Sequence, residues 1–224
     1  TRQGPLSGIR VIEIDAIGPV PLAGMLLADQ GAEVVRVARA ASAGASVWSD
    51  VGGGILHRSR NVVHLNLKNE SDRTKLLDLV GFADVLVEGF RPGVMERLGL
   101  GPDTCLARNP RLVYGRMTGW GQSGPLSQRA GHDLNYLAIT GALHAMGRKD
   151  GPPAVPLNLV GDYAGGAMFL VFGLLAAVLA AKTTGKGSVV DACITDSVPS
   201  LMSLFYAWLP TGAWRDQPQE NLLD

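Results

Sequence analysis

The 224-residue sequence is poor in charge and in cysteine, and both deficits limit what the protein can be. Charged residues make up 18% of the chain, and 20 Lys and Arg balance 20 Asp and Glu, so the formal net charge is zero. This balance argues against a nucleic-acid-binding surface and against a polybasic membrane anchor. The two cysteines, Cys105 and Cys193, have neither metal-binding nor redox spacing. They predict a reducing, cytoplasmic setting without a disulfide framework.

Several common motifs are absent as well. The chain has no G-x-S-x-G nucleophile elbow, no H-E-x-x-H zinc motif and no Walker lysine loop. Its four histidines lack zinc-type spacing, so no metal site is expected. Residues 1–7 show no signal-peptide pattern.

Residues 119–124 match G-x-G-x-x-G directly after a predicted strand. A dinucleotide site also needs a helix that opens there and an acidic residue about twenty positions on. Here Pro125 follows, and Asp150 lies too far along the chain. We therefore interpret these glycines as letting the backbone approach a ligand closely, not as a nicotinamide or flavin fingerprint.

The segment of residues 164–181 carries no charge, contains three glycines and six alanines, and ends before Lys182. Its length is at the lower edge of what a membrane-spanning helix needs. No second segment resembles it, and strand-like runs surround it. We expect a buried helix inside an α/β core and no membrane span.

Elsewhere, apolar runs alternate with turn residues, and hydrophobic residues reach 46% of the sequence, enough for a buried core. The expected strands cover residues 9–14, 32–37, 62–67, 85–88, 112–117 and 187–191. The expected helices cover residues 22–30, 70–80, 94–98, 103–109, 164–181 and 195–208. Residues 38–61 are expected to form a loop with at most a short helical piece. This alternation favours an α/β fold, with a doubly wound parallel sheet and helices on both faces.

Basic residues follow the ends of three predicted strands: Arg39, Lys68 and Arg91. Ligands of doubly wound sheets bind beyond the carboxyl ends of the strands, so this placement suits a phosphate-bearing ligand. The alternative, that each is an ordinary solvated surface charge, stays open for any one of them taken alone.

Residues 131–136 place a histidine, a carboxylate, an amide and a phenol together after the glycine-rich loop. Further on, Asp162 stands between glycines at the expected start of the apolar helix, whose dipole favours an anion. A lone histidine is often structural, and an aspartate before a helix is often an N-cap. From these residues alone, catalysis and a structural role remain equally open for His132 and Asp162.

Longer motifs in collinear order carry a family resemblance. They span residues 4–11, 29–37, 88–101, 116–125, 131–136 and 158–162. Through them the chain resembles the CoA-transferase family III superfamily (CaiB/BaiF-like), and within it the α-methylacyl-CoA racemase branch. The resemblance implies a Rossmann-like CoA-binding domain over residues 1–185, followed by a strand and helix (186–224) that lead toward a smaller domain. It also implies a homodimer of interlocked chains.

Matched position by position, the resemblance implies that His132 and Asp162 are the acid/base pair, supported by Asn158. The residues implied to contact coenzyme A, with the phosphates held by the basic ones, are Ile17, Arg39, Leu65, Leu67, Lys68, Arg91, Arg97, Gly131, Asp133 and Tyr136. No prosthetic group is implied, because coenzyme A enters as part of the thioester substrate. Family members continue beyond the position of Asp224, where they complete the small domain and supply a carboxylate partner for the histidine.

The implied activity is racemisation of 2-methylacyl-CoA through an enolate, with a base on one face of the α-carbon and an acid on the other. Transferase relatives use the residue at the position of Asp162 as a nucleophile and typically carry Tyr-Asp where this chain has His132 and Asp133. A histidine there favours the racemase branch. Two alternatives remain open, a CoA-transferase acting between carboxylic acids and an inactive CoA-binding module.

Overall fold

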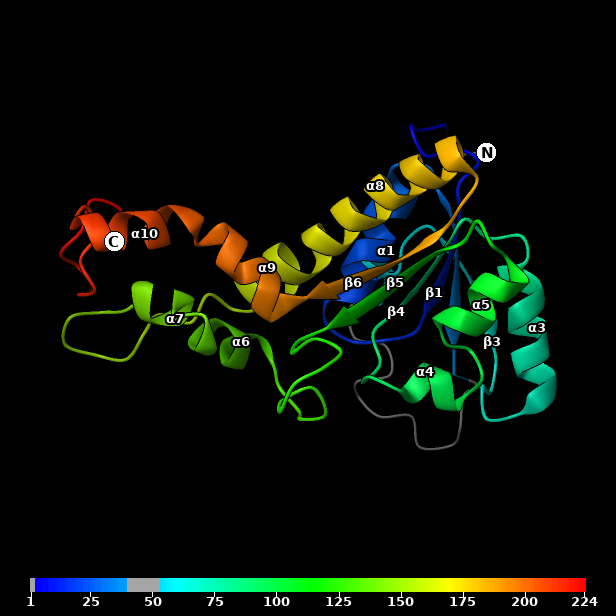
Figure 1. The fold of residues 1–224 in the computed structure, drawn as a ribbon, viewed down its shortest axis with the longest axis horizontal. Helices are drawn as coiled ribbons and strands as arrows, with labels where there is room; N and C mark the ends of the chain where they lie inside the picture. The colour runs from blue at the N-terminus through cyan, green and yellow to red at the C-terminus, as the bar shows by residue number, and fades with distance from the viewer. Residues whose placement is uncertain (1–2, 40–52) are drawn as a thin grey trace.

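A six-stranded parallel sheet forms the centre of the computed structural model, which describes residues 3–39 and 53–224 (Figure 1). Its strands are β1 (Arg10–Ile14), β2 (Glu33–Ala38), β3 (Arg60–His64), β4 (Val85–Glu88), β5 (Val113–Thr118) and β6 (Ser188–Cys193). They lie in the order β3-β2-β1-β4-β5-β6. Every neighbouring pair is parallel. The prediction of an α/β fold with a doubly wound parallel sheet is confirmed.

Helices cover both faces of this sheet (Figure 1). One face carries α1 (Pro19–Asp29) and a long helix made of a π-helical segment (Leu159–Met168) and α8 (Phe169–Thr184). The other carries α3 (Glu70–Val80), α4 (Val94–Arg97) and α5 (Pro102–Arg108), while the short α2 (Gly53–Leu56) contacts α1. Successive strand residues point to opposite faces. Val11 therefore belongs to the core under α1 and α8, and Ile12 to the core under α3.

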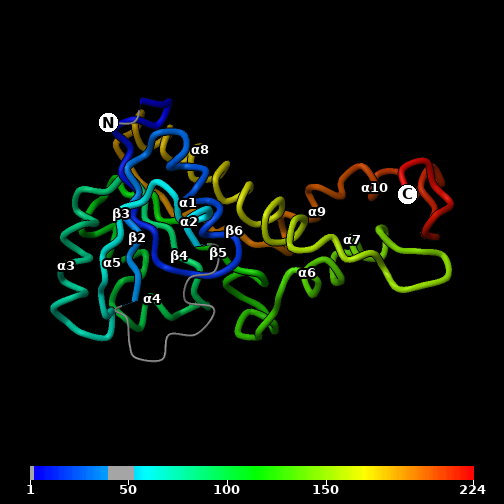
Figure 2. Tube along the Cα trace, turned by 180° about the vertical axis from the view of Figure 1, so that it is seen from behind, coloured from blue at the N-terminus to red at the C-terminus, as the bar shows by residue number. Residues whose placement is uncertain are grey.

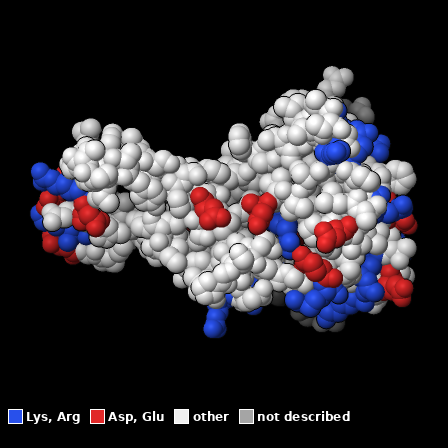
Figure 3. All heavy atoms as spheres, viewed as in Figure 1, with Lys and Arg blue, Asp and Glu red and all other residues white. Residues whose placement is uncertain are grey.

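The remaining elements extend from the carboxyl edge of the sheet as an arm, seen from both sides in Figures 1 and 2. They are α6 (Asp133–Ile139), α7 (Ala142–Ala145), α9 (Ile194–Leu201), α10 (Ser203–Trp208) and the 3-10 turn Leu209–Thr211. At the tip, Trp214 is buried and meets Phe205 edge to face, with ring centroids 4.8 Å apart. On the face drawn in Figure 3, most charged side chains gather over the sheet and at the tip, and the surface between them carries few.

The long apolar helix differs from its prediction. It begins at Leu159, five residues early, and runs to Thr184. Only one side is buried: Leu170 and Leu174 pack on the sheet, whereas Phe172 is 74% and Leu179 71% exposed. Within the described residues it is the one helix long and apolar enough for a membrane span, a property that core helices share.

Other boundaries shift by a few residues. The strand predicted over 62–67 is β3, which begins at Arg60, and the helix predicted over 195–208 divides at Met202. The helices α6 and α7 were not predicted as such. Of the loop predicted over 38–61, residues 40–52 lie outside the described part of the chain. The predicted domain boundary at 185/186 falls just before β6, an edge strand of the same sheet, and where the domains divide stays a prediction.

Candidate active site

A cleft of about 700 Å³ lies beyond the carboxyl ends of β1, β4 and β5. The strand order reverses between β1 and β4, so the loops that follow them diverge and leave an opening there. The starts of α6 and of the π-helical segment form its far wall. The predicted site residues that line it are Ile17, Arg91, Gly131, His132, Tyr136, Asn158 and Asp162.

The turn after β1 lies close to the carboxyl group of Asp162. Gly18 adopts φ 77°, in the left-handed region that glycine occupies without strain. A Cβ at this position would sit 3.8 Å from the Asp162 carboxyl carbon. Pro19 and Pro21 then open α1, because proline suits the first helical turn, where no intrahelical acceptor awaits its missing N–H.

His132 stands on the far wall of the cleft, at the N-cap of α6. Its backbone N–H donates to Oδ1 of Asn135 at 2.9 Å, which fixes the residue where the glycine-rich loop becomes helix. The residue is exposed, and it lines the cleft together with Asp162. His132 interacts electrostatically with the Asp162 carboxylate and lowers the pKa of that group. The two predicted acid/base residues are therefore near each other in the cleft.

Asp162 lies in the first turn of the π-helical segment, a rare helix type that is frequent at functional sites. Its pKa is raised to about 6, first because burial disfavours the carboxylate and then because Asp133 is a second negative charge. A hydrogen bond from the side chain of Asn158 and the nearby His132 oppose these effects only in part. Asn158 thus contacts the group that it was predicted to support.

Asp133 faces away from the cleft, toward the helix that carries Asp162. It is 6% exposed, and its Oδ2 accepts the backbone N–H of Asp162 at 2.7 Å. The N–H of Gly161 is a second donor to this carboxylate. A Cβ on Gly161 would lie 2.6 Å from Oδ2, so glycine is required for this approach. The assignment of Asp133 to coenzyme A contact stays a prediction, but its side chain holds the start of the π-helical segment.

One glycine of the 119–124 loop, Gly119, lies against an aromatic pair. Trp120 and Tyr136 meet edge to face with centroids 4.7 Å apart, and a Cβ on Gly119 would lie 2.0 Å from Cζ of Tyr136. Burial raises the pKa of Tyr136 to about 12, so the phenol stays neutral at physiological pH. The helix that a dinucleotide fingerprint requires does not open here, because α6 starts only at Asp133.

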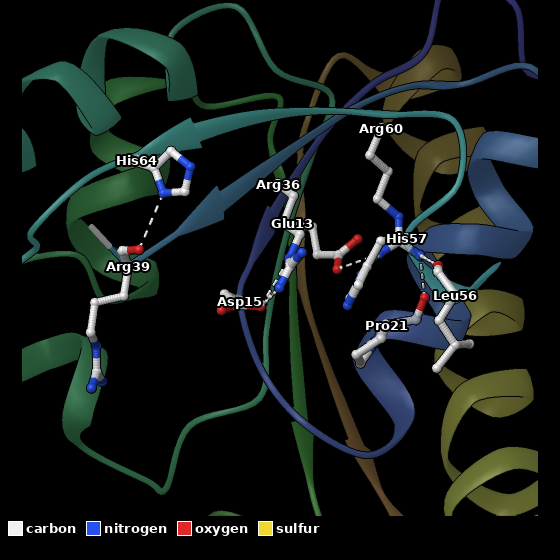
Figure 4. Close-up of polar contacts among 9 residues, drawn as sticks. All are labelled: Glu13, Asp15, Pro21, Arg36, Arg39, Leu56, His57, Arg60 and His64. Carbon is white, nitrogen blue, oxygen red and sulfur yellow. Dashed lines mark hydrogen bonds and ion pairs between the residues drawn. The ribbon is translucent and has the colours of Figure 1, made fainter. Parts of the chain in front are cut away.

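The other predicted coenzyme A contacts lie outside the cleft lining. Arg39 is exposed at the end of β2, where its carbonyl oxygen lies 3.2 Å from Nδ1 of His64 (Figure 4). Lys68 and Arg97 are exposed as well. Leu65 is buried in the core under α3, and Leu67 packs against it. The structure therefore brings Arg91, but neither Arg39 nor Lys68, to the cleft that holds His132 and Asp162, and the phosphate-binding roles of all three stay predictions.

The chain is similar to several known proteins over nearly its whole length. The family model described as CoA-transferase family III matches residues 6–222. The alpha-methylacyl-CoA racemase of Mus musculus is 42% identical over 219 residues, which are 98% of this chain and 55% of the relative. The acetyl-CoA:oxalate CoA-transferase of Acetobacter aceti is 34% identical over 94% of this chain and 56% of its own.

Among solved structures, a CAIB/BAIF family protein from Brucella suis aligns with a TM-score of 0.85 and 26% identity. It covers 97% of this chain and 60% of its own. The chain thus spans about half the length of the curated relatives it matches. A family match over nearly the whole chain, together with the shared fold, leads to one conclusion: the chain belongs to CoA-transferase family III.

Proposed function

We propose that the protein is an acyl-CoA racemase that interconverts (2R)- and (2S)-2-methylacyl-CoA. The observation that carries the proposal is the placement of His132 and Asp162 in one cleft at the switch point of the sheet. The 42% identity to a protein named alpha-methylacyl-CoA racemase supports it. We further propose that it works as a homodimer, in keeping with the family resemblance.

The chemistry needs one proton donor and one proton acceptor. The proton α to a thioester is acidic because the carbanion delocalises into the carbonyl as an enolate. In one direction, neutral His132 removes this proton while protonated Asp162 delivers another to the opposite face, and the roles reverse for the other enantiomer. A pKa of about 6 leaves part of the Asp162 population protonated near neutral pH, as a general acid requires.

The developing enolate oxygen needs hydrogen-bond donors. The start of the Asp162 helix is a poor source, because the N–H groups of Asp162 and Gly161 already donate to Asp133. The N–H groups of Asp133 and Leu134 at the start of α6, beside His132, are candidates, whereas the N–H of Asn135 already donates to the carbonyl oxygen of His132. We therefore place the carbonyl oxygen of the substrate at the start of α6.

The test is loss of α-proton exchange without loss of binding. His132→Ala and Asp162→Ala should each lower deuterium incorporation from D₂O into a 2-methylacyl-CoA by about 10²–10⁴-fold. Calorimetric affinity for coenzyme A should stay close to that of the wild type. His144→Ala is the matched control, because His144 is exposed on α7 and pairs with Asp216 at 3.0 Å, on the arm. Normal deuterium incorporation in either site variant would refute the assignment.

A CoA-transferase is the second candidate, favoured by the relative from Acetobacter aceti. In that reaction the carboxylate of Asp162 attacks the thioester carbonyl and expels the CoA thiolate, which gives an acyl anhydride. An assay with a free carboxylic acid as acceptor separates the two candidates. Transfer of CoA to the acid identifies a transferase, whereas loss of optical activity without transfer identifies a racemase. Coenzyme A binding with neither reaction would identify an inactive binding module.

A further inference from the structure

A buried ion pair outside the catalytic cleft contacts the backbone of the cleft wall. Glu13 on β1 and Arg60 on β3 both have fully buried side chains. Their strands flank β2, and both side chains point to the face that α1 covers (Figure 4). A Cβ on Gly24 of α1 would lie 1.9 Å from Oε2 of Glu13, so the helix leaves a gap at this point for the carboxylate.

The guanidinium of Arg60 gathers four partners. Its Nη1 donates to Oε1 of Glu13 at 2.9 Å and lies 2.9 Å from Nδ1 of His57. Its Nη2 donates to the carbonyl oxygen of Leu56 at 2.5 Å and to that of Pro21. Figure 4 shows the guanidinium directed toward these acceptors, which come from β1, from α1 and from the end of α2.

Burial of this pair is costly, and stability alone is a weak reason to keep it. Burial raises the pKa of Glu13 to about 7 and lowers that of Arg60, although each group attracts the other. Buried ion pairs are often replaceable by apolar residues of similar volume without loss of stability. A planar guanidinium differs from an apolar side chain in that it fixes several acceptors in a set geometry.

Two of the four partners belong to the wall of the cleft. Pro21 and Leu56 both line it, on the side of the turn that follows β1 and faces Asp162. Ile17 and Val20 line the same side, so this wall is apolar. We propose that Arg60, held by Glu13, is a positioning residue that fixes the wall made by Pro21 and Leu56 and thereby sets the affinity for the CoA thioester. The inference rests on the proposed function for the identity of the ligand.

The test compares arginines two residues apart. Arg60→Met should raise the dissociation constant for coenzyme A and the KM for a 2-methylacyl-CoA by about tenfold, with kcat nearly unchanged, because binding is lost equally in ground and transition states. Arg60→Lys keeps the charge but reaches fewer acceptors, so a loss of about threefold is expected. Arg58→Met is the control: Arg58 pairs with Asp29 at the surface, and both constants should stay within twofold of the wild type.

Thermal unfolding is recorded for each variant, so that affinities are compared only between folded proteins. A folded Arg60→Met protein with wild-type affinity overturns the proposal, even if it is less stable. If Arg60→Met does not fold, the proposal is tested with Arg60→Lys. A folded Arg60→Lys protein with unchanged affinity for coenzyme A and unchanged KM overturns the proposal. Wild-type protein that binds coenzyme A but exchanges no α-proton refutes the proposed function, while the dissociation constants still test the role of Arg60. Absence of coenzyme A binding by the wild type refutes both.

Discussion

The two sides of the cleft bury acidic groups in opposite ways. On the side of β1, Glu13 is paired with Arg60, and the guanidinium also satisfies backbone carbonyls. On the side of α6, Asp133 holds backbone N–H groups instead, and within the described residues no Lys or Arg forms an ion pair with it. Because the charges of Glu13 and Arg60 cancel, this pair fixes the shape of its wall and adds little net charge to it. An unneutralised carboxylate raises the proton affinity of its neighbour, and that neighbour is Asp162.

The largest effect on this difference between the two sides is expected when the side chain of Asp133 is removed. Asp133→Ala leaves the N–H groups of Gly161 and Asp162 without their acceptor, so the free energy of unfolding should fall by about 2–3 kcal/mol. Urea denaturation measures this loss. Asp150→Ala, at an exposed position, is the control and should change the value by no more than about 0.5 kcal/mol. Equal stability of the two variants would show that the Asp133 contact contributes nothing.

Asp133→Asn separates the hydrogen bond from the charge, because asparagine keeps an acceptor oxygen but is neutral. The pKa of Asp162 should then fall toward its ordinary value, since Asp133 is the second cause that raises it. The pH profile of α-proton exchange should shift to lower pH by several tenths of a unit to about one unit. An unshifted profile would mean that the charge of Asp133 does not contribute to the proton affinity of Asp162.

Gly161→Ala is expected to lower the stability somewhat less than Asp133→Ala does. The added methyl would lie 2.6 Å from Oδ2 of Asp133, so the carboxylate or the helix must move, at a cost of about 2 kcal/mol. Gly151→Ala is the matched control, because a Cβ at position 151 meets nothing within 4 Å. Thermal unfolding of the two proteins gives the comparison, and similar midpoints would argue against tight packing at Gly161.

The smallest expected effect is a pH dependence of stability. The pKa of Asp162 is raised from 3.8 to about 6 in the folded state, so the folded chain binds its proton more tightly than the unfolded chain. The resulting stability is fully present below pH 3.8 and is lost as pH rises through about 6. Because the residue is partly solvated, we expect only about 1 kcal/mol. Asp162→Asn should flatten this part of the profile and leave the slope near pH 7 from Glu13 and Glu88, whose pKa values are about 7.

The α/β class with a doubly wound parallel sheet was predictable from local patterns, but the pairing of His132 and Asp162 was not, because those patterns left catalysis and a structural role equally open. Alternating apolar runs identify a doubly wound sheet, and such sheets bring the residues after β1, β4 and β5 to one edge. The resemblance of long motifs then assigned roles that single residues left open. Strand ends were less exact, since β3 begins at Arg60 and not at position 62.

The sequence did not reveal contacts between residues that are far apart along the chain. Arg60 and Glu13 are 47 positions apart, and the signal available was a glutamate that follows Val11 and Ile12 and precedes Ile14 in β1. The family resemblance assigned Asp133 to coenzyme A contact, and its side chain turns toward residues 161 and 162. The π-helical turns left no trace in the apolar pattern, because small residues such as Gly165 and Gly166 suit either helix type.

The π-helical segment also makes the protein sensitive to chain length in a way that substitutions do not test. Asp162 and the buried residues Leu170 and Leu174 belong to one continuous helix, so their relative orientation depends on how many residues lie between them. Each residue of an α-helix turns the chain by about 100°. Inserting one residue between Asp162 and Phe169 would add a turn of this order and swing the carboxyl group out of the cleft. The number of residues in this segment therefore matters to the site as much as the identity of the acid, because it sets where the carboxyl group lies.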